Sequence, residues 1–585
     1  RNSLIIIVRY MMAQKSDEVR TNFQLNFVTM KKMYYFAATL LIMLFAACSN
    51  DHIGQDDDDG IVTDPTGEAW ISLDIKTTAP KALGRALNNP DKEMGTPAES
   101  AVSKLRVIFF DENRNVTADK SFTVGTNSEA GEPGQPEGIL GTAFKVPAAS
   151  KRILVIANPS VDLPDVGLFN SYDDFNQAIV AVASLSTPSY FMMTNAKGDL
   201  EPSQANGDET DLTLYNSASK AESQPLSIHI DRAVAKVRVY TDNGNISSNN
   251  LKANISEPGW VLNATNKRYF PVSKRVKTWM EGTSRGCITP FDQYDLGSYR
   301  IDPNHDVQPL MSDPGFASYL QEYNYEMNAV NIASSAWHPT EISVDNVEYC
   351  LENTQTADHN VWAYTTQVLF KVIYSPKGLI DPDKNVYNNP ADNVNNGELL
   401  PGTDWLMVNG GYYTWNLLMD YIKAELLYKY TSEDKDPTVI YTAALSKTLN
   451  SYLKAIGTPE VSTDRGNGTP ETRANEVVDN FNQKRSNVEN YGAFRHGTVS
   501  YYKGGVNYYP IMIKHDDTDQ VYNEYGEFGV VRNSVYDVHI SKVNNPGYPN
   551  IPEPDPGTKD EDEDNYLSIR INVNPWTWYT QTEEL

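Results

Sequence analysis

Apolar and polar residues alternate in two short stretches near opposite ends of the chain. Ala69–Lys76 and Leu567–Val573 both carry aliphatic side chains at every second position. The aliphatic positions are Ile71, Leu73 and Ile75 in the first stretch and Leu567, Ile569, Ile571 and Val573 in the second. Because side chains of a strand point alternately to its two faces, each stretch predicts a strand with one buried face.

Apolar runs without alternation lie between these two stretches. Leu105–Asp111 and Arg152–Asn158 end in turn residues, a pattern typical of strands that are covered on both faces. Further strands are expected at Tyr190–Thr194, Gln367–Tyr374, Tyr508–Lys514 and Val535–Val543. Strands around Asp231–Val239 are marked by Ile228, Ile230, Ala235, Val237 and Val239.

A helical period occurs in three places. Ser171–Ala183 has a capping serine, acidic residues in its first turn and one apolar stripe. The apolar positions of two later helices are Trp415, Leu418, Met419, Ile422 and Leu426, and then Leu445, Leu449, Tyr452 and Leu453. The pattern therefore predicts a mainly β protein with a few inserted helices.

Composition shifts divide the chain into segments. We expect a lipoprotein signal at 30–48, a tether and first strand at 49–85, an N-terminal β domain at 86–225, a C-terminal β domain with the helical insertion at 226–543, and a linker with a last strand at 544–585. Asn544–Asn565 is rich in proline, glycine and acids, which is typical of an extended, solvated linker. Residues 1–29 carry no such signal and are excluded, with Met30 or Met33 as the natural start.

The net charge limits the kinds of partner. The chain has 585 residues and a formal charge of −27, from 76 acidic and 49 basic residues. So acidic a surface repels nucleic acid and anionic lipid. The chain has three cysteines. Apart from Cys48, which is discussed below, Cys287 and Cys350 either form a disulfide or are free thiols.

Lys31–Cys48 predicts the destination of the protein. Two lysines precede a short apolar run that ends in small residues, as in a secretory signal. Phe45-Ala46-Ala47-Cys48 resembles the bacterial lipobox, in which the cysteine is acylated after cleavage. The alternatives are a simple signal peptide that contains a cysteine and an uncleaved anchor helix.

No catalytic or cofactor motif is found in the sequence. There is no Gly-x-Ser-x-Gly elbow, no His-Glu-x-x-His pair and no phosphate-binding Walker loop. Gly466-Asn-Gly468 lacks a third glycine, and His515-Asp516-Asp517 is explained as a strand end that runs into a turn. We therefore expect no enzyme activity, no cofactor and no metal.

Several segments together resemble the fimbrillin family, the subunits of type V pili of Gram-negative anaerobes. They are Asp231-Arg-Ala-Val-Ala-Lys-Val-Arg-Val239, Tyr349-Cys-Leu-Glu-Asn353, Tyr508-Tyr-Pro-Ile-Met512, Val531-Arg-Asn533 with Tyr536, Leu567-Ser-Ile-Arg-Ile-Asn-Val-Asn-Pro-Trp576 and, more loosely, Ile156-Ala-Asn-Pro159 with Phe191–Asn195. The length is closer to the shaft subunit of the short, minor fimbria. Residues 380–500 fit neither fimbrillin pattern.

The resemblance implies two β-sandwich-like (transthyretin-like) domains with an extended C-terminal strand. It also implies a surface lipoprotein, anchored to the outer membrane only through the lipid on Cys48, that an arginine-specific protease trims. Arg85 lies beyond the first predicted strand, so we expect the cut between Arg85 and Ala86, with Lys81 as the alternative for a lysine-specific enzyme. The displaced strand is then Ile71, Leu73 and Ile75, and the donor strand from the next copy is Leu567, Ile569, Ile571, Val573 and Trp576.

The implied partners are further copies of the chain, accessory anchor and tip subunits, the protease, and a receptor on host or bacterial cells. A charge at Ile569 or Ile571 is expected to block assembly, and a charge at Ser568 on the opposite face to be tolerated. The alternative is a monomeric surface lipoprotein that binds glycan or a partner protein, with its last strand folded back on its own domain.

Overall fold

The computed structural model is mainly β, as the sequence pattern predicts. It describes residues 60–77, 93–124, 141–187, 190–195, 212–242, 246–248, 252–275, 299–309, 313–326, 336–341, 343, 346–438, 441–464, 467–515, 522–560 and 567–577. The chain divides into Arg1–Asp59 and Gly60–Leu585, and every described residue belongs to the second unit.

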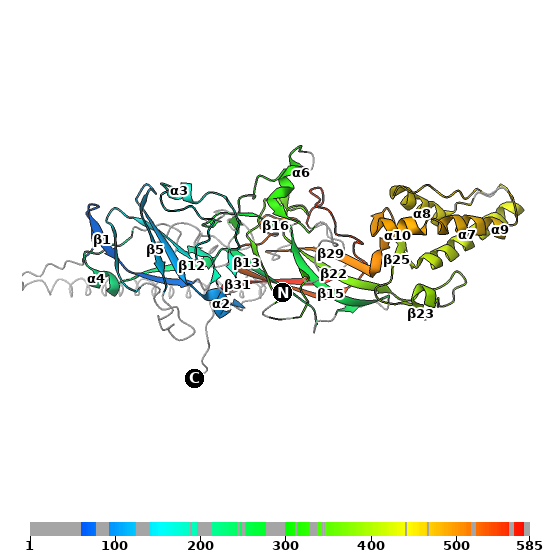
Figure 1. Ribbon diagram of the computed structural model, residues 1–585, viewed down its shortest axis with the longest axis horizontal. Helices are drawn as coiled ribbons and strands as arrows, with labels where there is room; N and C mark the ends of the chain where they lie inside the picture. Colours follow the sequence, from blue (N-terminus) through cyan, green and yellow to red (C-terminus); the bar gives the residue numbers. More distant parts are fainter. Residues whose placement is uncertain are drawn as a thin grey trace, which may run out of the picture. The chain divides into compact units, whose positions relative to one another are not determined.

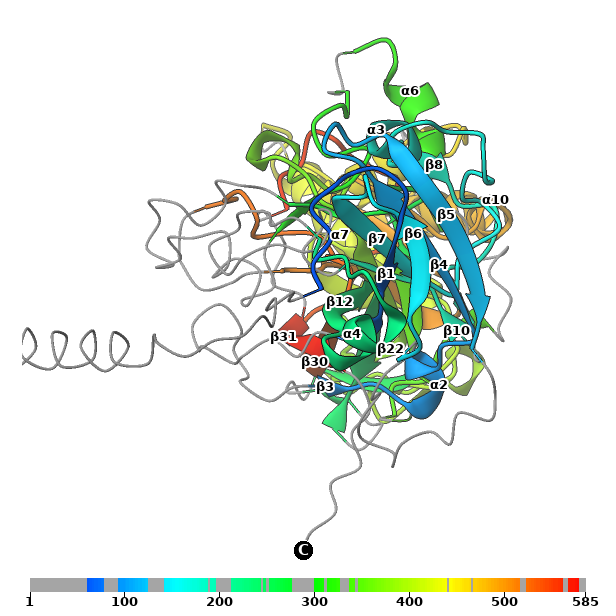
Figure 2. The ribbon, with the colours of Figure 1, turned by 90° about the vertical axis from the view of Figure 1, so that its left-hand side faces the viewer.

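A six-stranded sheet organises the N-terminal part (Figures 1 and 2). Its order is β2 (Leu73–Thr77), β12 (Leu226–Arg232), β11 (Met193–Asn195), β7 (Arg152–Ala157), β4 (Lys104–Phe110) and β5 (Val116–Thr123). All neighbours are antiparallel except β2 and β12. The apolar runs form the central strands β4 and β7, whose residues from Leu105 to Phe110 and from Ile153 to Ala157 are buried.

The second layer over this core is a two-stranded sheet of β1 (Glu68–Ile71) and β6 (Phe144–Pro147). Short elements complete the cover, namely α3 (Tyr172–Phe175), β8 (Ile179–Val180) paired with β17 (Arg268–Tyr269), β10 (Tyr190–Phe191) paired with β9 (Ser186–Thr187), and α4 (Ala218–Ser223). Side chains from both layers form one buried apolar cluster.

A second core lies between two further sheets. One contains β21 (Glu348–Leu351), β13 (Val234–Tyr240), β30 (Ser534–Val543), β31 (Leu567–Thr577) and β3 (Glu93–Met94), with β14 (Ser247–Ser248) on β30. The other contains β15 (Ala253–Asn263), β22 (Gln367–Pro376) and β29 (Val506–Met512). Buried residues of β13 and β30 pack against those of β15, β22 and β29, as in a sandwich.

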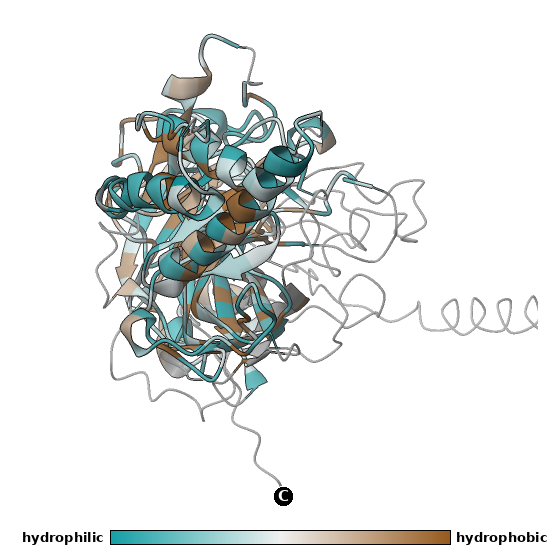
Figure 3. Cartoon of the chain, turned by 90° about the vertical axis from the view of Figure 1, so that its right-hand side faces the viewer, coloured by the Kyte–Doolittle hydropathy of each residue, from teal (hydrophilic) through white to brown (hydrophobic). Residues whose placement is uncertain are grey.

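The helical insertion has a core of its own. It contains α7 (Trp415–Lys435), α8 (Ala444–Ala455), α9 (Pro470–Asn482) and α10 (Arg485–Tyr491), beside β25 (Trp405–Val408), β26 (Gly411–Tyr413), β27 (Phe494–His496) and β28 (Val499–Tyr502). Apolar side chains of all four helices form one cluster, and Figure 3 shows teal over much of the outside of this region. The two predicted helices are confirmed, whereas α9 and α10 were missed.

Three expectations differ from the structure. The helix predicted at Ser171–Ala183 is a single turn, α3, capped by Ser171 as expected, and the residues after it pair as β8 with β17. The strand Ala69–Lys76 is broken at Ser72 into β1 and β2. β12 pairs with β2 and β11, so the chain passes from the first sheet to the second at Ala233, later than the expected boundary at 225.

Candidate functional site

The first strand crosses between the two layers of the N-terminal core. β1 pairs with β6, and Trp70 exchanges two backbone hydrogen bonds with Tyr215 at 2.7 and 2.8 Å. After Ser72 the chain continues as β2, which runs parallel to β12 with Ile75 opposite Ile228. Because the chain keeps its two-residue period across the break, the aliphatic face stays on one side. Ala69, Ile71, Leu73 and Ile75 are all at most 1% exposed.

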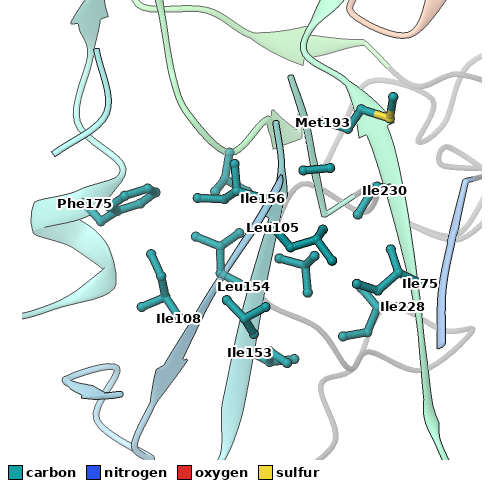
Figure 4. Close-up of a cluster of buried hydrophobic side chains, with 14 of the residues drawn as sticks. Ile75, Leu105, Ile108, Ile153, Leu154, Ile156, Phe175, Met193, Ile228 and Ile230 are labelled. Carbon is teal, nitrogen blue, oxygen red and sulfur yellow. The ribbon is translucent and has the colours of Figure 1, made fainter. Parts of the chain in front are cut away.

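The groove that holds this strand is lined by apolar side chains. Ile228 and Ile230 of β12 and Val146 of β6 are at most 1% exposed. Figure 4 shows Ile75 beside Ile228, with Leu154 and Leu105 further into the same cluster. Burying a large aliphatic side chain contributes about 1.5–3 kcal/mol, so Ile71, Leu73 and Ile75 together contribute roughly 4.5–9 kcal/mol.

The last strand pairs from Leu567 to Pro575 with β30 of its own chain (Figure 2). In this antiparallel ladder Ile569 lies opposite Ile540 and Ile571 opposite Val538, both of which are fully buried. Ile569 and Ile571 are half-buried and pack against the second core. Two of the predicted aliphatic positions of β31, Ile569 and Ile571, therefore face the second core.

The other edge of β31 is paired only near its end. Glu93 and Met94 of β3 run parallel to Trp576 and Thr577. Along the rest of β31, the described part of the chain provides no strand on that side. In the N-terminal sheet, β2 has β12 as its one strand neighbour among the described residues. Both candidate assembly strands thus lie at or near sheet edges, where a strand can be gained or lost.

A buried polar cluster holds α2 (Pro97–Ser100) where the two sheets meet. Lys236 Nζ lies 2.8 Å from Glu99 Oε1, with both side chains 4% exposed, and Tyr349 donates to the same oxygen at 2.6 Å. Burial alone raises the pKa of Glu99, but the charge of Lys236 and these hydrogen bonds outweigh it and lower that pKa. Arg232 donates to the Glu99 carbonyl at 2.9 Å, and burial lowers the pKa of Arg232 to about 10.

The segment expected to be a solvated linker is docked over its described length, 544–560. Tyr548 exchanges backbone hydrogen bonds with Tyr508 at 2.9 Å, and Ile551 is 4% exposed. Asp560 is 1% exposed and accepts a hydrogen bond from the Thr365 hydroxyl. We call residues 544–560 the strap. The composition predicts a solvated linker, whereas buried residues such as Ile551 and Asp560 hold the strap against the second domain.

The remaining predicted site residues are placed as follows. Cys48, Arg85, Ala86 and Cys287 lie outside the described residues, and Leu567, Val573 and Trp576 lie in β31. Cys350 is a buried free thiol whose pKa burial raises. Within the described part of the chain no three metal-ligating side chains gather, and no helix there has the length and apolarity to cross a membrane.

Comparisons with known proteins find two family models of fimbrial subunits that match parts of the chain. Residues 73–255 match the family described as "Major fimbrial subunit protein (FimA)". Residues 500–582 match "Major fimbrial subunit protein type IV, Fimbrillin, C-terminal". These matches contain β2 with its neighbour β12, and β30 with β31. A search of curated proteins finds no match.

Solved structures give weaker similarities. A fimbrilin (FimA) from Porphyromonas gingivalis W83 is 12% identical with a TM-score of 0.35, covering 88% of this chain and 99% of that one. The C-terminally truncated tip fimbrial protein Mfa3 from P. gingivalis is 9% identical with a TM-score of 0.30, covering 87% and 100%. The fimbrial anchor protein Mfa2 from P. gingivalis is 13% identical with a TM-score of 0.20, covering 35% and 62%. In residues 73–255 and 500–582 the chain is thus similar to the major fimbrial subunits that these two family models describe.

Proposed function

We propose that this fimbrial subunit polymerises by strand exchange after a protease removes its first strand. The vacated groove between β12 and β6 then accepts the C-terminal strand of the next copy. The observation that carries the proposal is the first strand itself. It fills the core of the N-terminal domain with Ile71, Leu73 and Ile75, and a second strand with the same aliphatic period stands at the other end of the chain.

The proposed route to the cell surface begins with acylation of Cys48, which anchors the precursor to the outer membrane. Cys48→Ala is expected to abolish palmitate labelling and to leave unprocessed precursor. An arginine-specific protease then cuts between Arg85 and Ala86. N-terminal sequencing of polymer chains tests this cleavage site. Chains that begin at a residue other than Ala86 would contradict it.

The proposed partners follow from the assembly. Copies of this chain form the shaft of a surface fimbrium, anchor and tip subunits end it, and the polymer supports adhesion to host or bacterial cells. The family matches support the fimbrial role, and the receptor and the accessory subunits are part of the proposal.

Two complementary variants test the exchange. Arg85→Ala retains the first strand, so its groove stays filled, but it can donate a last strand. A chain that ends at Asp560, cut at Arg85, has an empty groove and no donor, and it keeps the strap with its buried Ile551. Neither variant polymerises alone, and their mixture is expected to yield one-to-one dimers by size-exclusion chromatography with light scattering.

The alternative is a monomeric surface lipoprotein, and the pairing of β31 with β30 of the same chain favours it. Under that alternative the mixture stays monomeric, because the last strand of every copy remains on its own β30. Fibres formed by the chain without β31 would refute strand exchange outright.

A further inference from the structure

The first and last strands share more than an aliphatic period. The first reads Ile71-Ser-Leu-Asp-Ile75 and the last reads Leu567-Ser-Ile-Arg-Ile571. In both, aliphatic residues stand at the first, third and fifth positions, a serine at the second and a charged residue at the fourth. The serine is the informative position, because a polar residue on the outer face of a strand is normally free to vary.

Ser72 is not on an outer face. It is 1% exposed, although it points to the side opposite Ile71 and Leu73. Its hydroxyl donates to the Gly141 carbonyl at 3.1 Å, and its own carbonyl accepts from the Leu226 amide at 2.8 Å. Ser72 is the residue at which the chain leaves the pairing with β6 and enters the pairing with β12. Both faces are covered there, so the position takes a small side chain that can donate a hydrogen bond.

We propose that the donor strand enters the groove in the register that puts Ser568 in the place of Ser72. It runs in the same direction as the strand that it replaces. Ile569 then fills the space of Leu73, and Ile571 that of Ile75. This inference rests on the proposed strand exchange and specifies how the two copies fit.

Shifted registers place unsuitable residues at the covered position. A shift by two residues puts Arg570 where Ser72 lies, which buries a guanidinium in a space that holds a hydroxyl. A shift by four puts Asn572 there and brings Pro575 into the space of Ile75, where the smaller ring fills it poorly. A shift by one turns the aliphatic face away from the core.

The register also predicts which residues face each other across the two copies. Asp74 pairs with Ser227, so Arg570 of the incoming strand is expected opposite Ser227. Asp74 is half-buried and Ser227 is exposed. A charge of either sign can reach solvent at that position, which explains how the two strands differ there without a change of register.

The proposal reverses one expectation drawn from the two-residue period. A charge at Ser568 is expected to block assembly, because Ser568 would take the place of Ser72, whose side chain is buried although it points away from the aliphatic face. Ser568→Asp is expected to lower the polymer yield at least about tenfold, whereas Ser568→Ala loses one hydrogen bond and is expected to stay within about tenfold of wild type. Arg570→Asp is the matched control, because it recreates the charge of the first strand and should assemble normally.

Cysteine pairs test the register directly in polymers of the full chain. Paired positions on neighbouring strands lie within reach of a disulfide, and positions one pair further along do not. Ser227→Cys with Arg570→Cys is expected to give disulfide-linked ladders after copper-phenanthroline oxidation, whereas Ser227→Cys with Asn572→Cys gives none. Single-cysteine variants control for Cys287 and Cys350. The melting temperature of each uncut precursor checks that the variant folds.

The outcomes separate the register from strand exchange. Ladders from the second pair alone, or from neither pair in a polymer that needs β31, would overturn the register and leave strand exchange standing. A polymer that grows from the chain ending at Asp560 would overturn both. Normal assembly of Ser568→Asp would contradict the closed position inferred from Ser72.

Discussion

Leu73→Ala separates the precursor from the mature polymer. Leu73 is fully buried opposite Leu226 in the N-terminal core of the uncut chain. If the proposed cut removes residues up to Arg85, the same side chain is absent from every subunit of the polymer. The substitution should therefore destabilise one form of the protein and leave the other unchanged.

The expected size follows from the burial of Leu73. A fully buried Leu→Ala change leaves a cavity and costs about 3 kcal/mol. For a domain of this size each kcal/mol lowers the melting temperature by about 2–4 °C, so the precursor should melt ~6–12 °C lower. Differential scanning calorimetry measures the melting temperature of the uncut precursor and that of the purified polymer, for the variant and for wild type.

Two control substitutions complete the comparison. Ile228→Ala removes a groove residue that both forms need, so it should destabilise both. Ile569→Ala should destabilise the polymer more than the precursor, because Ile569 is only half-buried on its own β30. A polymer of Leu73→Ala that melts as far below wild type as its precursor would show that the first strand is retained, and the reasoning would fail.

Three further predictions concern the second domain and its junction. Glu99→Gln should destabilise the precursor by about 3–5 kcal/mol in chemical denaturation, because it leaves Lys236 buried without its counter-charge, and an effect below 1 kcal/mol would contradict this. Burial lowers the pKa of His305 to about 4, so its neutral form adds stability above the unfolded pKa near 6.5 that is lost as the pH falls toward 4. His305→Gln should flatten that part of the pH dependence of the unfolding free energy, and an unchanged slope would refute it. Asp560→Ala removes the acceptor of the Thr365 hydroxyl and should make the strap cleavable in limited proteolysis at temperatures where wild type resists, with Asp555→Ala in the same segment as the comparison.

The periodicity of apolar residues predicts a strand or helix well where its buried positions recur regularly along the sequence. The strands β4, β7, β13 and β30 and the helices α7 and α8 follow from apolar runs and stripes. The helix expected at Ser171–Ala183 fails because Ile179 and Val180 pair with β17, which is distant in the sequence. Its cap and first turn were correct, so the local signal was real and tertiary pairing ended it.

The candidate site was predicted in part. The aliphatic positions of both end strands follow from a two-residue period, and their burial confirms this for Ile71, Leu73 and Ile75. The closed environment of Ser72 could not be predicted, because it depends on Gly141 and on Leu226, which the fold brings there from other strands. The strap was missed for a related reason, since its polar composition hides the few residues, such as Ile551, that anchor it.

The docked strap changes how a filament of these subunits would bear tension. A free linker from Asn544 would extend under force like a spring before the donor strand felt any load. With Asp560 held by hydrogen bonds to Asn360 and Thr365, the distance from Asp560 to Leu567 is limited by chain length to about 25 Å. A pull on the donor strand would then pass straight into the second domain at Asp560. The fibre would be stiff. Its extension under force would depend on how strongly Asp560 is held rather than on the length of the linker that begins at Asn544.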